Sequence, residues 1–448
     1  MSRVVVIGAG PNGLTAAAML RKSGHDVTLV DKRGPGGRFG GQIPVLHDTS
    51  LVSPAICGEL GLSLSWQDAP VPTAPDGTAL APPAAWTEFI RTWRPLVQGL
   101  CGEPVPDIGD DAPLWPLAKK ALSLRKPGSA NMMELLRLAP QNLDDMLGEF
   151  FEDAQQKALM MLPALIGSWM GPISPTSAAN LLLVETLRGQ EPVGGHEALV
   201  SALSEKAGTV TVAEVTSIRV EKGAVVGVDT DQGPIDADAV VSCIGPVTTL
   251  TRLVHPRHLP DHLHRDIGDV RGRGTVAKLH LKTSSPLFPH TLVRTAAQPL
   301  DIERAYDDAK HRRLPRHPAL EVRQLEHGVS VLVFGCARDL DGGWTDEAGA
   351  ALQATVLDQL ERLVPGTRDA IDEATLLSPA DLESGWGLDQ GNPFQVELAV
   401  DQLYVMRPLP RLARGDTGIR GLTLGSDGQH PGVGPTLVPG WLAAQRAT

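Results

Sequence analysis

The sequence is poor in cysteine and in aromatic residues. Its 448 residues include four cysteines, and aromatic side chains make up 4% of the chain, with only two tyrosines. No two cysteines are close enough for a C-x-x-C redox pair or a zinc knuckle, which argues against disulfide exchange as its chemistry. With so few rings, a binding pocket lined by Met and Leu is expected rather than an aromatic cage.

Positive charge and long apolar runs are also scarce. The chain has 40 Lys and Arg against 52 Asp and Glu, a net charge of −12, which argues against nucleic-acid binding through a basic surface. The longest apolar run, residues 158–170, is shorter than the ~20 residues that a membrane span needs, and Pro163 interrupts it. Because a strand pattern and not a signal peptide opens the sequence, we expect a cytoplasmic protein.

Glycine is abundant instead, with 47 residues, and it first gathers after a buried-strand pattern at residues 4–7. The G-x-G-x-x-G motif at residues 8–13 follows directly and leads into small, helix-forming residues. A second strand pattern, residues 26–30, ends at Asp31. This order of strand, glycine turn, helix, strand and acid is typical of a dinucleotide-binding unit.

The positions of this unit have predicted roles. Gly8 permits the tight turn, Gly10 lets the backbone approach a pyrophosphate, and Gly13 lets helix and strand pack closely. The unpaired N–H groups of the helix N-terminus would hold the negative charge of the ligand. Asp31 would accept hydrogen bonds from the adenosine ribose.

The residues after Asp31 indicate which dinucleotide is bound. Residues 31–38, DKRGPGGR, resemble the acid-then-GGR extension of the FAD-binding amine oxidase and phytoene desaturase superfamily. The resemblance implies that Gly36 and Gly37 let the chain run close to the flavin diphosphate and that Arg38 pairs with its charge. It also implies that the backbone of Val215 contacts the adenine.

The carboxyl-terminal part resembles the same superfamily. Residues 381–408 are similar to bacterial phytoene dehydrogenase-related oxidoreductases, in which D-L-E, G-G-N-x-F and D-Q-L-x-x-x-R-P recur in this order. Residues 421–444 resemble the strand, turn and helix that close the FAD site, with Asp427 near the diphosphate and the helix N-terminus at the flavin. The predicted cofactor-binding residues are Gly8, Gly10, Pro11, Asn12, Gly13, Asp31, Lys32, Gly36, Gly37, Arg38, Val215, Gly425, Ser426, Asp427, Gly434, Pro435 and Thr436.

Two residues are catalytic candidates. Lys278 lies on a strand pattern, residues 274–281, that looks like the amine oxidase strand whose lysine reaches flavin N5 through a water. The alternative interpretation is a strand lysine that faces solvent. His430 lies in the closing motif, where one inserted residue and Val433 in place of glycine would reshape the floor under the flavin ring.

Two charged clusters have plainer interpretations. Four histidines between His255 and His264 fit no common zinc spacing, so we predict no metal site. The basic residues at 310–316 are interpreted as a solvated loop, with transient contact with an anionic membrane surface as the alternative.

The sequence therefore predicts an α/β fold in which a Rossmann-like FAD-binding domain of the glutathione reductase type 2 class is interleaved with an α+β substrate domain. We assign residues 1–65, 190–280 and 412–448 to the FAD-binding domain, and residues 66–189 and 281–411 to the substrate domain. A second G-x-G-x-x-G after a strand is missing from the sequence, so no resident NAD(P) domain is expected.

The expected function is an FAD-dependent oxidoreductase that dehydrogenates, or desaturates, a largely apolar small molecule by hydride transfer to flavin N5. Oxygen or another acceptor would reoxidise the flavin. A redox-neutral flavin-dependent isomerase or cyclase would use the same motifs. A non-catalytic binding protein with the fold of the GDP-dissociation inhibitors is the second alternative.

Overall fold

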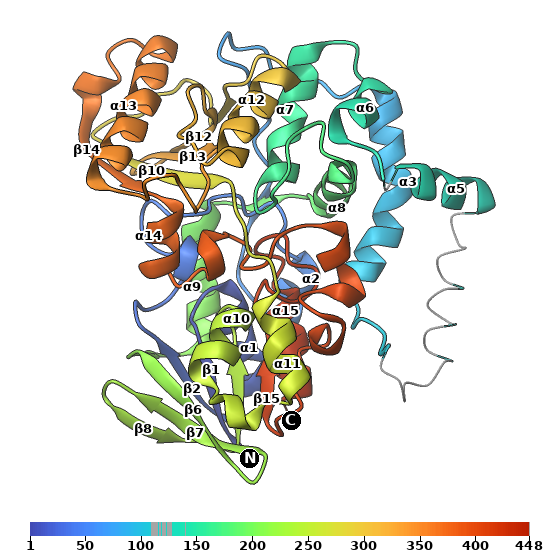
Figure 1. Cartoon of the computed structure of the whole chain (residues 1–448), viewed down its shortest axis with the longest axis vertical. Helices are drawn as coiled ribbons and strands as arrows, with labels where there is room; N and C mark the ends of the chain where they lie inside the picture. The colour runs from blue at the N-terminus through green and yellow to red at the C-terminus, as the bar shows by residue number, and fades with distance from the viewer. Residues whose placement is uncertain (109–114, 116–117, 119–121, 123–127, 139, 448) are drawn as a thin grey trace.

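The chain folds around two sheets, one in the lower and one in the upper half of Figure 1. The computed structural model describes residues 1–447 apart from 109–114, 116–117, 119–121, 123–127 and 139. Both ends of the chain lie in the lower half. In the part of the chain that the structure describes, no helix is long and apolar enough to cross a membrane.

The lower sheet is parallel and has the strand order β15-β9-β1-β2-β5. Its strands are β1 (Arg3–Ile7), β2 (Asp26–Asp31), β5 (Val210–Val212), β9 (Ala239–Ser242) and β15 (Leu422–Leu424). Residues 4–7 of β1 are buried on both faces, as their β-branched pattern predicts. The strands of this sheet therefore come from three separate parts of the sequence, residues 3–31, 210–242 and 422–424.

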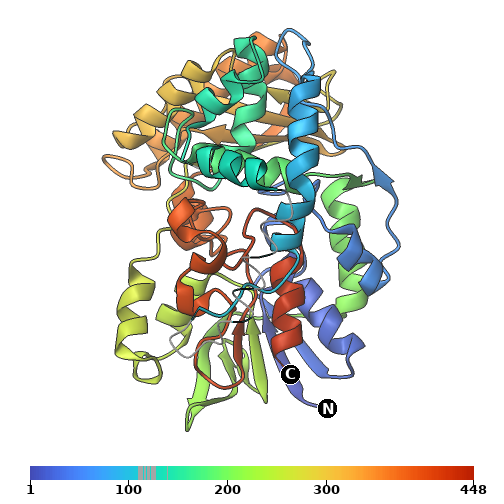
Figure 2. The same cartoon turned by 90° about the vertical axis from the view of Figure 1, so that its right-hand side faces the viewer.

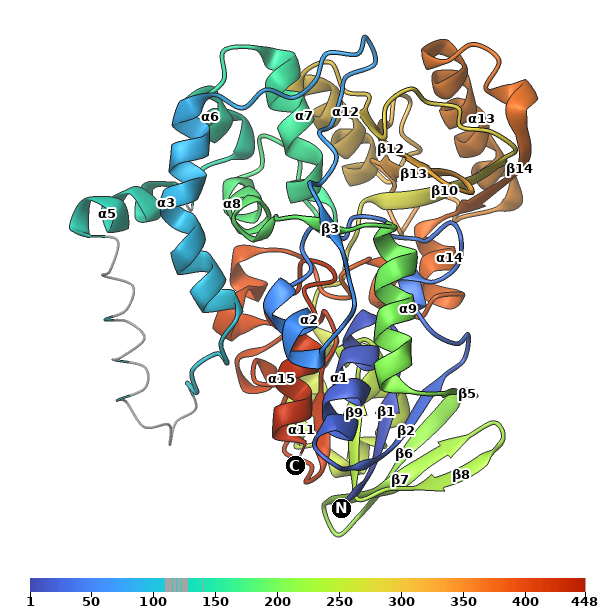
Figure 3. The ribbon, with the colours of Figure 1, turned by 180° about the vertical axis from the view of Figure 1, so that it is seen from behind.

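Helices cover one face of the parallel sheet and a small sheet lies near the other. The first face packs against α1 (Pro11–Lys22), α9 (Gly195–Ala207) and α15 (Val438–Arg446), which Figure 3 shows side by side. On the other side lie α11 (Asp261–Gly268) and the antiparallel strands β6 (Val215–Glu221), β7 (Ala224–Thr230) and β8 (Gly233–Asp236). Although β5 directly precedes β6 in the chain, it pairs with β2 in the parallel sheet.

The upper sheet is antiparallel, with the order β11-β12-β13-β10-β14. Its strands are β10 (Val276–Thr283), β11 (Leu292–Arg294), β12 (Ala319–Leu325), β13 (Gly328–Phe334) and β14 (Ile371–Leu377). One face is apolar and packs against α13 (Asp346–Leu363). The assigned domain boundary at residue 280 falls inside β10, because this strand pairs with β13 and β14 along its whole length.

Most of the remaining helices lie around the upper sheet or between the two halves (Figure 2), whereas the helices at residues 54–60 and 246–248 lie beside the parallel sheet. They are α2 (Pro54–Leu60), α3 (Ala84–Cys101), α5 (Ser129–Leu138), α6 (Leu143–Gly148), α7 (Ala154–Leu165), α8 (Ser177–Leu187), α10 (Pro246–Thr248), α12 (Pro299–Lys310) and α14 (Pro379–Ser384), and the short strands β3 (Trp66–Gln67) and β4 (Glu191–Pro192) pair with each other. Residues 143–165 form two helices, α6 and α7, because Asp153 caps the start of α7 by accepting hydrogen bonds from the backbone of Gln155 and Gln156.

Candidate cofactor site and active site

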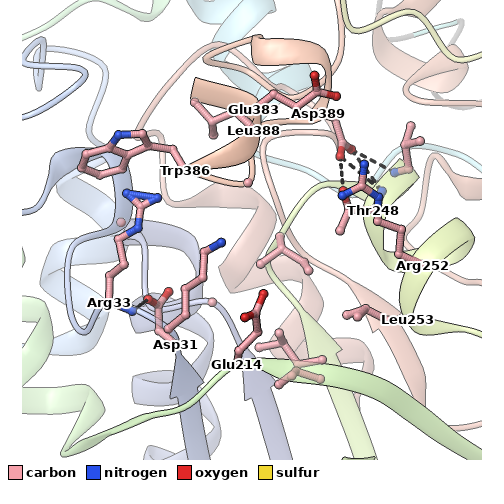
Figure 4. A pocket seen from close by; sticks show the side chains of 18 of the residues that line it. Asp31, Arg33, Glu214, Thr248, Arg252, Leu253, Glu383, Trp386, Leu388 and Asp389 are labelled. Carbon is pink, nitrogen blue, oxygen red and sulfur yellow. Dashed lines mark hydrogen bonds between the residues drawn. The ribbon is translucent and has the colours of Figure 1, made fainter. Parts of the chain in front are cut away.

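A cavity of about 510 Å³ lies at the carboxyl ends of the parallel strands (Figure 4). The loops that follow β1, β2, β5 and β9 line its floor, which is where ligands bind in open parallel sheets. Among the predicted residues, Gly8, Asp31, Lys32, Gly37 and Val215 line this cavity. The structure thus brings together residues from three separate segments of the predicted nucleotide site.

The glycines of the first turn are required for different reasons. Gly8 has a φ of +93°, a backbone conformation that favours glycine. A Cβ on Gly13 would lie 1.7 Å from the carbonyl oxygen of Gly8, so helix and strand could not pack. Gly10 has an ordinary φ of −69°, and a Cβ there would meet no described protein atom within 4 Å. Packing therefore leaves open space at Gly10, where a bound pyrophosphate would approach the backbone.

Asp31 is held at the end of β2 by the turn that it faces. Its carboxylate accepts hydrogen bonds from the backbone N–H of Ala9 at 2.8 Å and of Arg33 at 2.7 Å. The side chain is half-buried and lines the cavity. This placement holds the carboxylate beside the glycine turn and at the cavity, so the ribose contact of Asp31 stays a prediction.

Arg38 and Asp427 form a buried ion pair behind the glycine turn. Asn12 at the start of α1 donates to Asp427 at 2.6 Å, so the first and last segments of the chain meet here. The Nε atom of Arg38 has no hydrogen-bond partner among the described residues. The predicted phosphate-binding cation is therefore present, buried and incompletely paired.

Residues 383–390 form one wall of the cavity opposite Asp31 (Figure 4). The guanidinium of Arg33 stacks 3.7 Å from the ring centre of Trp386 and donates to the carbonyl of Gly385. Asp389 accepts hydrogen bonds from the backbone of Val247 and Thr248, at 3.0 and 3.2 Å. Burial raises the pKa of Asp389 to about 6, which these hydrogen bonds oppose. Sequence reasoning did not single out Arg33 and Trp386.

Beyond this cavity wall, the family-like segment at residues 381–408 also has structural roles. Arg407 is fully buried, and its guanidinium donates to six backbone carbonyls, those of Phe394, Val396, Glu397, Gln402, Asp427 and Gly432. Asn392 donates to the carbonyls of Gly167 and Arg273, both at 3.0 Å. These contacts hold the segment against the closing turn. Arg407, in the R-P at the end of the motif, therefore positions the backbone around the site.

A smaller cavity of about 40 Å³ lies beside the closing turn, where Gly434 and Pro435 form part of its wall. Its lining is apolar except for His47, Asp48 and Glu321. Lys278 lies next to these groups, fully buried, and its amine donates to Ser330. The interpretation of Lys278 as a solvent-facing strand lysine is therefore wrong. The alternation of residues along this strand predicts a polar side that faces solvent. It does not predict that residues 41–48 cover that side.

His430 lies in a third cavity, of about 190 Å³, away from Gly434 and Pro435. Its Nε2 lies 3.1 Å from the carbonyl oxygen of Leu100, and its ring packs edge-on against Tyr404, with 5.1 Å between the ring centres. Leu, Val, Met and Ala side chains from α3, α5, α6 and α8 provide most of the lining. His430 is thus a polar group at the edge of an apolar cavity.

The structure shows the local surroundings of the other predicted cofactor residues. A Cβ on Gly425 would lie 2.6 Å from the Cβ of Ala443, so glycine lets α15 approach. Ser426 accepts a hydrogen bond from the backbone of Gly428 at 3.1 Å. The hydroxyl of Thr436 is buried without a hydrogen-bond partner among the described residues. Pro11 begins α1, and Gly36, with a φ of +102°, begins the turn to Arg38.

The two charged clusters are accounted for locally. His255 accepts from the backbone of Arg257, whose side chain in turn donates to His258. Within the described ranges, no three His, Cys, Asp or Glu side chains are placed to hold a metal ion. In the basic loop, Arg313 and Arg316 pair with Asp308, and Arg312 pairs with Asp341.

Comparison with known proteins agrees with this geometry. Residues 3–165 match the model of the FAD dependent oxidoreductase family (DAO). Over 98% of its length the chain is 25% identical to pyridine nucleotide-disulfide oxidoreductase domain-containing protein 2 of Rattus norvegicus, covering 92% of that protein. It is 27% identical to phytoene dehydrogenase of Streptomyces griseus, with 100% of this chain and 95% of that protein covered.

Solved structures share the fold. An oxidoreductase from Methanosarcina mazei has a TM-score of 0.60 at 17% identity, with 99% of each chain covered. Putrescine oxidase has a TM-score of 0.57 at 16% identity, with 99% of this chain and 97% of that chain covered. The predicted fold class is confirmed: a Rossmann-like parallel core combined with antiparallel sheet domains.

The fold, the site and these comparisons define an FAD-dependent oxidoreductase. Within that class the chain resembles the phytoene dehydrogenases in sequence and shares its fold with the amine oxidases, as the motifs predicted. The residues present fit FAD, because Gly10 leaves room for a pyrophosphate and Arg38 offers a buried N–H that no residue in the described part of the chain accepts. The predictions of an enzyme and of FAD as its cofactor are confirmed.

Proposed function

We propose that the chain dehydrogenates a largely apolar small molecule that enters through the 190 Å³ cavity at His430. The observation that supports this proposal is the lining of that cavity: apart from Cys101, Tyr404 and His430, it consists of aliphatic side chains, Met146 and Pro431. Transfer of an apolar substrate from water to such a surface is favourable. A highly charged substrate would find few hydrogen-bond or ion-pair partners there.

The residues of the chain divide the work around the cofactor. Asp31 and the turn at Gly10 would hold the adenosine and pyrophosphate, and Arg38 would neutralise phosphate charge. FAD, when bound, supplies a hydride acceptor at its N5 atom. The apolar walls exclude water and hold a C–H bond of the substrate in one orientation, which is the main contribution required of the protein.

Anaerobic spectroscopy tests this function. The names of two relatives, phytoene dehydrogenase and putrescine oxidase, supply opposite probes: a polyene hydrocarbon and a polar diamine. We expect detergent-solubilised phytoene to bleach the flavin band of the purified holoenzyme while putrescine leaves it unchanged. Bleaching by the amine alone would contradict the proposal.

Product analysis separates the redox-neutral alternative. An isomerase or cyclase would convert the hydrocarbon without reducing any electron acceptor, whereas dehydrogenation passes two electrons to an acceptor for each double bond formed. A purified protein that is colourless and takes up no added FAD would overturn both the proposed dehydrogenation and the redox-neutral alternative.

A further inference from the structure

A segment from the upper half of the molecule closes one side of the 510 Å³ cavity. This segment, residues 383–390, is called here the wall segment, and it begins at the end of α14. It contacts the nucleotide-binding half at two places. Figure 4 shows them on opposite sides of the cavity, with Arg33 and Trp386 on one side and Thr248 and Asp389 on the other.

The two contacts lie on either side of the glycine turn. Arg33 follows β2, whereas Val247 and Thr248 follow β9, and β1 lies between these two strands in the sheet. The wall segment therefore spans the carboxyl end of β1, where the turn at residues 8–13 begins. Gly8 and the wall segment line the same cavity. A dinucleotide whose pyrophosphate lies on this turn thus lies between the wall segment and the sheet.

The contact at Asp389 is buried and has several hydrogen bonds. Its carboxylate accepts from the backbone N–H of Val247 at 3.0 Å, and from the N–H and the hydroxyl of Thr248 at 3.2 and 2.5 Å. A Cβ on Gly245 would lie 2.1 Å from a carboxylate oxygen of Asp389, so the two segments pack closely. Opening the wall segment at this end would break these buried hydrogen bonds together, which is costly.

The contact at Trp386 is weaker. The Arg33 guanidinium lies 3.7 Å from the centre of the Trp386 ring and donates to the carbonyl of Gly385. Arg33 is exposed and Trp386 is half-buried, so water competes with both interactions. Trp386 lies between two glycines, and Gly387 has a φ of +64°. The backbone that carries the ring therefore has few steric restraints.

We propose that the stacked pair of Arg33 and Trp386, called here the latch, must open before FAD enters or leaves the cavity. The wall segment opens on the Arg33 side, while the buried contact at Asp389 stays closed. Both members of the latch belong to the protein, so the latch stabilises the closed wall segment with or without FAD. It therefore slows FAD binding and FAD release alike and has little effect on the affinity.

The latch concerns the cofactor, so it does not rest on the proposed substrate. Trp386→Leu tests it, because leucine removes the ring but keeps an apolar side chain beside Leu382 and Leu388. Exchange of bound FAD for radiolabelled FAD measures release from the holoenzyme. Stopped-flow mixing of the FAD-free protein with FAD, followed by flavin fluorescence, measures binding. We expect both rate constants to rise about fivefold, and the dissociation constant to stay within about twofold of the parent value.

This outcome differs from that of a simple contact with the cofactor. If Trp386 only touched FAD, its loss would raise the release rate alone and would weaken the affinity by the same factor. A rise in the release rate alone, or no change in either rate, would overturn the latch. Either result would leave the proposed dehydrogenation intact, because the holoenzyme would still contain its flavin.

The partner residue and two controls complete the test. Arg33→Lys keeps the charge but loses the planar face, so it should also raise both rates. Because the pair acts as one unit, the double variant should be no faster than the faster single variant, and additive effects would overturn the latch. Trp386→Phe keeps an aromatic face and should stay within about twofold of the parent rates. Trp344→Leu changes another partly buried tryptophan, outside the cavity lining, and should leave both rates unchanged.

Proton NMR of the FAD-free protein tests the latch without the cofactor. The side-chain signals of Arg33, assigned by their loss in Arg33→Lys, should be shifted upfield by the ring of Trp386. In Trp386→Leu they should return to the positions typical of an exposed arginine. Signals already at those positions in the parent protein would overturn the latch, even if the protein proved to bind no FAD.

Discussion

At the scale of single residues, Gly10 and Gly13 separate ligand binding from folding. Gly13→Ala would drive its Cβ into the carbonyl of Gly8, at 1.7 Å, so we expect it to cost about 2 kcal/mol or more of unfolding free energy. Gly10→Ala meets no described protein atom, so its unfolding cost without FAD should stay below about 1 kcal/mol.

The FAD affinity completes this comparison. Urea unfolding of the FAD-free protein measures the change in unfolding free energy, and fluorescence titration with FAD measures the change in FAD affinity. Gly10→Ala should weaken FAD binding at least about tenfold, because its methyl group occupies the space left for the pyrophosphate. Wild-type affinity in Gly10→Ala would show that the phosphate lies elsewhere.

Asp31 offers a second test at this scale. Asp31→Asn keeps the shape of the side chain but removes the charge that accepts hydrogen bonds from Ala9, from Arg33 and from the expected ribose. We expect FAD affinity to fall about tenfold, equivalent to ~1.4 kcal/mol. Asp26→Asn, at the exposed start of the same strand, is the control and should bind FAD normally.

At the scale of elements, Arg407 holds together the segment that closes the site. Arg407→Lys keeps the positive charge but has three donors in place of a planar five-donor fork, so several of the six carbonyls lose their partner inside the protein. We expect a loss of about 3 kcal/mol in unfolding free energy. Arg411→Lys, at an exposed position four residues further on, should leave the urea midpoint unchanged.

The elements of the nucleotide site could be predicted from the sequence because local patterns encode them. Glycines at fixed spacing, a β-branched strand and a terminal acid each have a local physical cause, and they appear in the structure as β1, α1 and β2. Arg407 and Asn392 lie in a segment that resembles the phytoene dehydrogenase family, but their role depends on carbonyls from Gly167 to Gly432, which come together only in the folded chain. No local pattern predicts such contacts.

At the scale of the whole molecule, the polar face of the upper sheet is the feature that sequence reasoning could not place. The alternation in residues 276–283 correctly indicates one apolar and one polar face, and a polar face ordinarily meets water. Here residues 41–48 and the segment around Glu191 cover it, so Lys278 and Glu321 are buried. Burial of this face follows from the assembly of distant segments, and it turns ordinary strand charges into groups with shifted pKa values.

That burial makes the stability of the molecule depend on pH. Burial lowers the pKa of Lys278 from 10.5 to about 7, which Glu321 partly opposes. Between these values the unfolded chain binds a proton at Lys278 that the folded chain does not, so unfolding free energy rises with pH. Above pH 9 the buried thiols of Cys243 and Cys336, whose pKa values burial raises, act in the opposite direction, because they stay protonated only in the folded chain.

Between pH 7 and 8.5 Lys278 makes the largest contribution to this pH dependence, because the buried histidines His47, His196 and His280 titrate mainly below the interval and the buried thiols mainly above it. Over it we expect the unfolding free energy of the parent protein, measured with urea, to rise by about 2 kcal/mol. Lys278→Met has no amine to titrate, so its unfolding free energy should change by less than about 0.5 kcal/mol across the interval and should exceed that of the parent at pH 7. Lys282→Met changes an exposed lysine of the same strand and should keep the parent slope. A parent protein whose stability does not change between pH 7 and 8.5 would mean that Lys278 keeps an ordinary pKa, in which case it could not exchange protons near neutral pH.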